Sequence, residues 1–151
     1  MDTKLYNSLR KSIIFKDVSE VNFNEIVNEI PFRILDYKKN EILFFEGDDC
    51  NSIGIVLDGE VEVNKGLTIG KKVNITKIKA GDMFAEAVVF SQYHKFPATI
   101  EASSDSKVLF ISRENIVKMC SKYPDFIEKF MGILSTKISI LNNKVSLLSM
   151  K

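Results

Sequence analysis

Residues 1–30 place apolar side chains at a helical period. Ser19 is a candidate N-cap, and the apolar residues that follow it fit one face of a helix, namely Val21, Phe23, Ile26, Val27 and Ile30. Pro31 then ends the pattern, because proline cannot continue a helix. The segment from Met1 to Ile30 is therefore predicted to be helical.

The chain changes to short β segments between Phe32 and about Ser112. Five of them are rich in Val, Ile, Leu and Phe: residues 41–45, 52–58, 60–65, 71–78 and 106–111. The pair Asp58-Gly59 is typical of a two-residue hairpin turn, which needs positive φ. Short strands at this spacing predict a sandwich or a jelly roll. The glycines that punctuate the segments are Gly47, Gly59, Gly66, Gly70 and Gly81.

A helical period returns after Ser112 and continues to the end of the chain. Ser112 is the expected N-cap of a short helix through Cys120. Pro124 and Asp125 open a longer helix that is predicted to reach Lys151. Such a helix has about 27 residues and is ~40 Å long. Its apolar residues form a heptad seam with alternating spacings of 4 and 3: Ile127, Met131, Leu134, Ile138, Leu141, Val145 and Leu148.

A second apolar stripe lies beside this heptad seam: Phe126, Phe130, Ile133, Ile140 and Leu147. We expect one stripe to pack on the β domain. The seam is then left for the same helix of a second copy, in a parallel dimer, because a small roll cannot cover both faces of so long a helix. The alternative is a helix buried on two sides within a monomer. The predicted units are a β-roll with its flanking helices over residues 1–122 and the long helix over residues 123–151.

Composition and charge narrow the function classes. The 151 residues are 45% hydrophobic and 27% charged, an ordinary globular balance. The formal net charge is +1, so the whole chain has no electrostatic attraction for nucleic acid or for an anionic membrane. Residues 1–10 hold no apolar run of the signal-peptide type, and no stretch reaches the ~18 apolar residues that a membrane span needs. We therefore expect a cytoplasmic protein without membrane contact.

Residues that usually carry metal or catalytic chemistry are scarce. The chain has two cysteines, Cys50 and Cys120, and one histidine, His94. Two distant cysteines are too few for a zinc site or an iron–sulfur cluster. An enzyme of the cupin type needs two or three histidines, and His94 is a poor candidate for a haem ligand. The sequence also has no Ser/His/Asp or Cys/His arrangement and no P-loop. We expect no metal, no cofactor and no enzymatic activity.

Four segments carry a resemblance to a known family. Residues 37–48 (YKKNEILFFEGD) resemble its early strand and turn, and residues 56–63 (VLDGEVEV) its central hairpin. Residues 81–86 (GDMFAE) resemble the start of its phosphate-binding cassette, and residues 97–102 (PATIEA) the strand that leaves the cassette. Together with the order of elements, the chain resembles the effector domain of the Crp/Fnr regulators, within the cyclic-nucleotide-binding superfamily. This resemblance implies a mainly β double-stranded β-helix, or jelly roll, with flanking helices and a long C-terminal dimerisation helix.

The resemblance also implies an effector site between the cassette and the long helix. In the family, a cassette glutamate accepts from the ribose hydroxyl, and an arginine binds the cyclic phosphate. Glu86 matches the glutamate, with Ala85 in place of the glycine that usually precedes it. The corresponding cassette residues are Phe84, Ala85, Glu86, Ala87, Phe96, Pro97, Ala98 and Thr99, and those of the long helix are Ile138, Leu141 and Asn142.

Phe96 stands where the family has its arginine. Losing one charge-assisted contact to a phosphate costs about 1.5–3 kcal/mol, so we expect no ordinary response to cyclic AMP. Lys95 or His94 is the alternative source of positive charge. Phe96 either fills the core beside Phe90 or lines a pocket for an apolar or aromatic effector. Glu86 either contacts the effector or forms a cap or a pair inside the roll. Asn142 either contacts the effector, sets the register of the dimer or is simply an exposed polar residue.

Family members usually continue from the dimer helix into a winged helix-turn-helix that binds DNA, and no such motif follows here before Lys151. We therefore expect a ligand-sensing, homodimerising regulatory domain with an unknown small-molecule effector. In this view DNA is bound only through a C-terminal domain that this chain lacks. The alternative is a stand-alone cyclic-nucleotide-binding signalling module.

Overall fold

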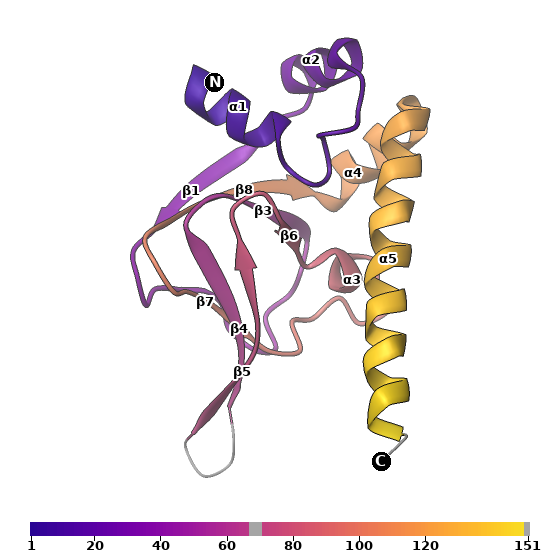
Figure 1. Ribbon diagram of the computed structural model, residues 1–151. Helices are drawn as coiled ribbons and strands as arrows, with labels where there is room; N and C mark the ends of the chain where they lie inside the picture. Colours follow the sequence, from indigo (N-terminus) through magenta and orange to yellow (C-terminus); the bar gives the residue numbers. More distant parts are fainter. Residues whose placement is uncertain (67–70, 150–151) are drawn as a thin grey trace.

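Two antiparallel four-stranded sheets form the body of the protein. The computed structural model describes residues 1–66 and 71–149. Figure 1 shows the sheets facing each other as a roll, with α1 and α2 at one end and the long α5 along one side. One sheet has the strand order β1-β8-β3-β6 and the other β2-β7-β4-β5. The strands are β1 (Arg33–Tyr37), β2 (Ile42–Phe44), β3 (Ser52–Asp58), β4 (Glu60–Gly66), β5 (Lys72–Lys79), β6 (Met83–Phe84), β7 (Thr99–Ala102) and β8 (Ser106–Ser112).

Five helices surround the sheets: α1 (Thr3–Arg10), α2 (Glu20–Glu29), α3 (Glu86–Val89), α4 (Arg113–Lys122) and α5 (Pro124–Ser149). The predicted fold class, a mainly β jelly roll with flanking helices and a long C-terminal helix, is confirmed. The predicted caps are also confirmed, since Ser19 Oγ accepts from Asn22 N and Ser112 Oγ accepts from Asn115 N. Gly70 and the expected helix end at Lys151 lie outside the described residues.

The prediction of a helical segment over residues 1–30 is wrong in its middle. Residues 11–18 form turns between α1 and α2. Ile13 N donates to Gly81 O at 2.8 Å, so the backbone there bonds to the roll instead of continuing a helix. Val21 was expected on the apolar face of α2 but is 76% exposed. It lies two residues before the buried Phe23, which places it on the opposite side of the helix.

The Asp58-Gly59 turn does not close a hairpin, contrary to the sequence prediction. Gly59 has the expected positive φ of 82°, but β3 and β4 belong to different sheets. A Cβ at Gly59 would lie 2.3 Å from Asp105 O, so the turn packs tightly against the connection between β7 and β8. This close approach turns the chain from one sheet into the other. The hairpin in this region is formed by β4 and β5.

The roll covers only the first half of α5. Three residues of the predicted second stripe are buried, namely Phe126, Phe130 and Ile133. The stacked rings of Phe126 and Phe130 lie 6.1 Å apart, and Phe15 of the 11–18 turn packs on Phe126. Ile140 and Leu147, expected in the same stripe, are 52% and 65% exposed. The burial of this stripe on the roll therefore stops after Ile133.

Candidate functional site

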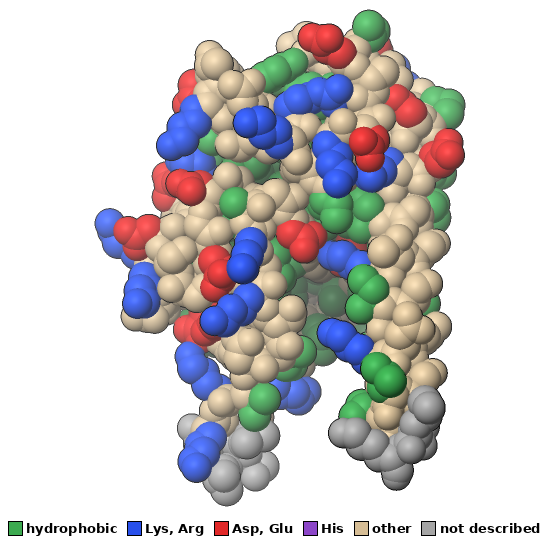
Figure 2. Space-filling view, in the orientation of Figure 1, with side chains coloured by type: hydrophobic (Ala, Val, Ile, Leu, Met, Phe, Trp, Pro, Cys, Tyr) green, Lys and Arg blue, Asp and Glu red, His purple; other side chains and the backbone are tan. Residues whose placement is uncertain are grey.

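A cavity of about 350 Å³ opens between the roll and α5. Its walls come from β4 and β5, from β6 with α3, from residues 96–98 and Ile100, and from α5. In Figure 2 the hollow beside α5 has hydrophobic side chains at its base and lysines at its edge. The cavity therefore joins the cassette segment of the sequence to the long helix.

The backbone around Phe84 and Ala85 shapes one wall. Phe84 on β6 pairs with Gly54 on β3, and a Cβ at position 54 would lie 2.2 Å from the Phe84 ring. Any larger residue at position 54 would overlap with the Phe84 ring, so this position requires glycine. Ala85 precedes α3 in the left-handed conformation, with φ of 73°. This conformation costs a residue with a Cβ roughly 1 kcal/mol, and it starts α3 so that Glu86 lies on the side of α5.

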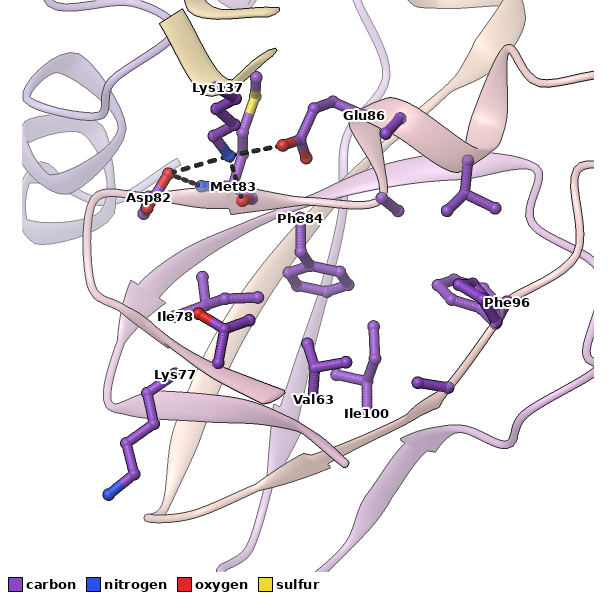
Figure 3. A pocket seen from close by; sticks show the side chains of 16 residues that line it. Val63, Lys77, Ile78, Asp82, Met83, Phe84, Glu86, Phe96, Ile100 and Lys137 are labelled. Carbon is purple, nitrogen blue, oxygen red and sulfur yellow. Dashed lines mark hydrogen bonds and ion pairs between the residues drawn. The ribbon is translucent and has the colours of Figure 1, made fainter. Parts of the chain in front are cut away.

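Glu86 and Lys137 join the cassette to α5. The Glu86 side chain is 9% exposed, and its Oε1 accepts a hydrogen bond from Lys137 Nζ at 2.5 Å. Lys137 Nζ also donates to Met83 O at 3.3 Å and lies 3.6 Å from Asp82 Oδ1. Figure 3 shows the three charged side chains turned toward one another. Oε2 of Glu86 is buried and has no hydrogen-bond partner among the described residues.

Lys137 is the site residue that the sequence analysis missed. It follows the buried Ile133 by four residues and precedes Ile140 by three. It therefore fills the first of two gaps in the stripe, between Ile133 and Ile140, and Lys144 fills the second, between Ile140 and Leu147. A charged residue at a helical position that continues an apolar stripe is the sequence signal that indicates such a site residue.

Phe96 is buried at the other end of the cavity. It is 3% exposed, and its ring stacks on Phe44 at 4.3 Å between centroids with an interplanar angle of 17°. Phe44 in turn meets Phe110 edge to face. The expected neighbour Phe90 is instead 38% exposed and packs on Phe130. Phe96 thus belongs to the core and also lines the cavity.

The two candidate substitutes for the arginine lie elsewhere. Lys95 Nζ pairs with Asp49 Oδ1 at 2.7 Å on the surface, where Lys95 holds the pKa of the Asp49 carboxyl below its usual range. His94 is exposed. Neither residue lines the cavity. The cation that the structure places there from α5 is Lys137.

The remaining predicted site residues divide into two groups. Phe84, Ala85, Ala87, Pro97 and Ala98 line the cavity with Glu86 and Phe96. Thr99 does not line the cavity, and its hydroxyl accepts a hydrogen bond from Glu46 N at 3.1 Å. The three predicted contacts on the long helix, Ile138, Leu141 and Asn142, are exposed and do not line the cavity in this single chain. They lie on the surface that also carries the heptad seam.

Six of the seven seam residues are at least 36% exposed, and Leu134 is partly buried: the exposed ones are Ile127, Met131, Ile138, Leu141, Val145 and Leu148. An apolar groove of about 340 Å³ between α4 and α5 continues this surface. Ile127, Met131 and Leu134 line it together with Phe90 and Cys120. The apolar surface therefore extends along the whole described length of α5.

The described residues meet neither the requirements of a metal site nor those of a membrane-spanning helix. Within residues 1–66 and 71–149, no three His, Cys, Asp or Glu side chains gather as a metal site. No helix of that part is long and apolar enough to cross a membrane. Cys50 and Cys120 are free thiols, and burial raises the pKa of each.

The chain thus combines a β-roll with a cavity of about 350 Å³ whose wall includes Lys137 of a long C-terminal helix. The chain belongs to the cyclic nucleotide-binding domain family, whose sequence profile matches residues 34–123. The expected resemblance to the effector domains of Crp/Fnr regulators is confirmed by its homologues.

Two curated relatives are regulatory proteins by name, one of them a transcriptional regulator. The anaerobic regulatory protein of Bacillus subtilis is 22% identical over 72% of this chain and 45% of its own length. The CRP-like cAMP-activated global transcriptional regulator of Mycobacterium tuberculosis is 22% identical over 74% of this chain and 50% of its own. The chain thus spans about half the length of the curated relatives it matches.

Solved structures support the same fold. A transcriptional regulator from Thermotoga maritima superimposes with a TM-score of 0.76 at 23% identity, covering 85% of this chain and 98% of that one. The catabolite activator protein of Thermus thermophilus gives a TM-score of 0.77 at 18% identity, covering 91% of this chain and 63% of that one. The roll and the helix that closes its cavity therefore belong to a common architecture.

Proposed function

We propose that this chain is the effector-sensing, homodimerising regulatory domain of a Crp/Fnr-type transcription regulator and has no catalytic role. One observation carries the proposal: α5 contributes Lys137 to the cavity wall, while the adjacent side of the same helix carries the exposed heptad seam. A single rigid helix thus belongs to both the ligand cavity and the candidate dimer surface. DNA contact is assigned to a part of the full-length regulator outside this sequence, by analogy with relatives twice as long.

The proposed effector is not cyclic AMP. Phe96 occupies the arginine position of the family and is fixed in its stack with Phe44. The cavity cation Lys137 is already paired with Glu86 and lies near Asp82. A cyclic phosphate would meet these two carboxylates without a free cation among the residues that line the described cavity, apart from Lys77 at its rim. The loss of one charge-assisted contact, about 1.5–3 kcal/mol, supports at least a tenfold weaker affinity.

The Glu86–Lys137 pair supplies a route from the ligand to the dimer. A ligand that engages Glu86 or Asp82 changes the attraction that holds the middle of α5 to the roll. Such a ligand favours the arrangement of α5 in which its own contacts are better, which is a shift between populated states. The helix is about 39 Å long. A small tilt of α5 about Lys137 therefore displaces Leu148, which lies farther along the helix, by a larger distance. That end of the seam is where the two helices of a dimer meet a following domain.

The dimer is the part of the proposal that a single variant tests best. We expect sedimentation equilibrium to give a dimer for the wild-type chain and a monomer for Leu141→Lys, because a charge at a seam position must be buried in the pair. Val21→Lys is the matched control, since Val21 is 76% exposed and lies on α2, away from the seam. A wild-type chain that stays monomeric up to about 0.5 mM, or a Leu141→Lys variant as dimeric as the control, contradicts the proposal.

A further inference from the structure

The cavity contains one buried acceptor that the protein leaves unsatisfied. Glu86 is 9% exposed, and Lys137 takes only its Oε1. Its Oε2 is buried and has no partner among the described residues. A buried charged acceptor without a donor is costly. Glu86 lines the cavity, so a ligand with a hydrogen-bond donor satisfies that buried oxygen once the carboxylate turns toward the cavity.

The charges at this end of the cavity favour a cation. Lys137 Nζ lies within 3.6 Å of one oxygen of Asp82 and one of Glu86. Two carboxylates against one ammonium group leave one excess negative charge. The second lining lysine, Lys77, starts from β5 and its side chain leads away from this cluster (Figure 3). An anionic group would therefore be repelled where a protonated amine would be attracted.

The other end of the cavity favours an apolar ring. Phe84, Val63, Ile100 and Phe96 face one another on the side of the sheets (Figure 3), and all four line the cavity. The volume of about 350 Å³ is near the lower end of ligand pockets, roughly 300–1,000 Å³. It suits a molecule with one or two rings.

We infer that the cavity binds a small amphipathic amine, with its protonated nitrogen on Glu86 Oε2 and its ring among the apolar side chains of the roll. This inference rests on the proposed function and deepens it by naming the chemical class of the effector. Lys137 is an internal competitor in this account, since its ammonium group already holds the neighbouring oxygen. A ligand amine shares the carboxylate with Lys137 and so weakens the bond between the roll and α5.

Three probes of nearly equal size test whether the cavity prefers a cationic, a neutral or an anionic group: 2-phenylethylamine, 2-phenylethanol and phenylacetate. Each is titrated at pH 7 into the 151-residue chain, with NMR shifts of the Ala85 and Glu86 amides as the readout. We expect the amine to bind at least about tenfold tighter than phenylacetate, with the alcohol between them. Glu86→Gln should reduce that ratio to about twofold or less. Glu128→Gln, an exposed change of the same charge on α5, should leave it unaltered.

The variant Lys137→Met gives a second readout that does not depend on how well Glu86→Gln folds. It removes the competing cation, so the amine should bind more tightly than to the wild-type chain. If phenylacetate binds as well as the amine, or if Lys137→Met weakens amine binding, the inference is overturned while the proposed sensing function stands. If none of the three probes shifts the two amides at about 20 mM, the inferred amine site is overturned, and the proposed function is still tested separately by the oligomeric state of Leu141→Lys.

Discussion

Replacing Lys137 by Met measures how strongly α5 is held to the cassette. The substitution keeps the length of the side chain and removes its charge, which leaves Glu86 with no cation within hydrogen-bonding distance among the described residues. Breaking a fully buried ion pair costs about 3–5 kcal/mol, and breaking an exposed pair about 0.2–1 kcal/mol. Glu86 is 9% exposed and Lys137 36%, so we expect about 1–2 kcal/mol. At this chain length the melting temperature should fall by roughly 2–8 °C.

A double-mutant cycle isolates the pair from other effects of the substitution. In a Glu86→Gln background, Lys137→Met should cost less than about 0.5 kcal/mol, because the carboxylate that needs the ammonium group is gone. Lys144→Met is the control, since Lys144 is exposed on the same helix and surface changes usually stay within about 0.5 kcal/mol. Urea unfolding is measured at one fixed protein concentration, because a dimer would make the midpoint concentration-dependent. Equal costs of Lys137→Met in both backgrounds would refute the reasoning.

Three further predictions concern the site and its supports. Ala85→Gly should raise the free energy of unfolding by about 0.5–1 kcal/mol, because glycine adopts the left-handed φ of 73° without strain. Ala87→Gly inside α3 should lower the free energy of unfolding. Calorimetry that ranks the two variants in the opposite order contradicts the backbone argument. Phe96→Ala should lower the free energy of unfolding, measured with urea, by about 3–5 kcal/mol. The control Tyr93→Ala should lower it by about 0.5 kcal/mol or less, because Tyr93 is 77% exposed. Similar losses for the two variants would mean that the Phe96 ring is not packed in the core. Lys122 lowers the pKa of Glu25 by hydrogen bonding, so this contribution to stability is present above the ordinary carboxyl pKa and is lost as pH falls through the lowered one. The urea midpoints of wild type and Glu25→Gln should therefore converge as the pH falls below the ordinary carboxyl pKa, and a gap that widens on acidification speaks against the pair.

The fold was largely predictable from the sequence because its signals are local. Ser19 and Ser112 cap helices through bonds to residues three positions away, and apolar runs between glycines mark the strands. The turn at Asp58-Gly59 shows the limit. Its local geometry was predicted, but the tight contact with Asp105 that sends β4 into the other sheet is made by residues far along the chain. The hydrophobic pattern along the chain does not predict a contact between residues so far apart in sequence.

The candidate site was predictable in part for the same reason. Glu86 and Phe96 were identified through the resemblance of their neighbours in sequence, and both line the cavity. Lys137 comes from an element about 50 residues later, and its role depends on which turn of α5 passes the cassette. That register is set by the burial of Phe126, Phe130 and Ile133. The predicted helix contacts Ile138, Leu141 and Asn142 missed the lysine by between one and five positions.

The most direct test of the account is thermal unfolding of the chain with and without about 1 mM cyclic AMP. The central claim is that a cyclic nucleotide-binding fold here carries a cavity that no longer suits a cyclic phosphate, because Phe96 is stacked in the arginine position and Lys137 is paired with Glu86. The account predicts a change in melting temperature of less than about 1 °C. A ligand present at about 100 times its Kd stabilises the folded state by about 2.7 kcal/mol, which corresponds to roughly 5–10 °C at this size. A saturable rise of that magnitude with cyclic AMP would contradict the claim.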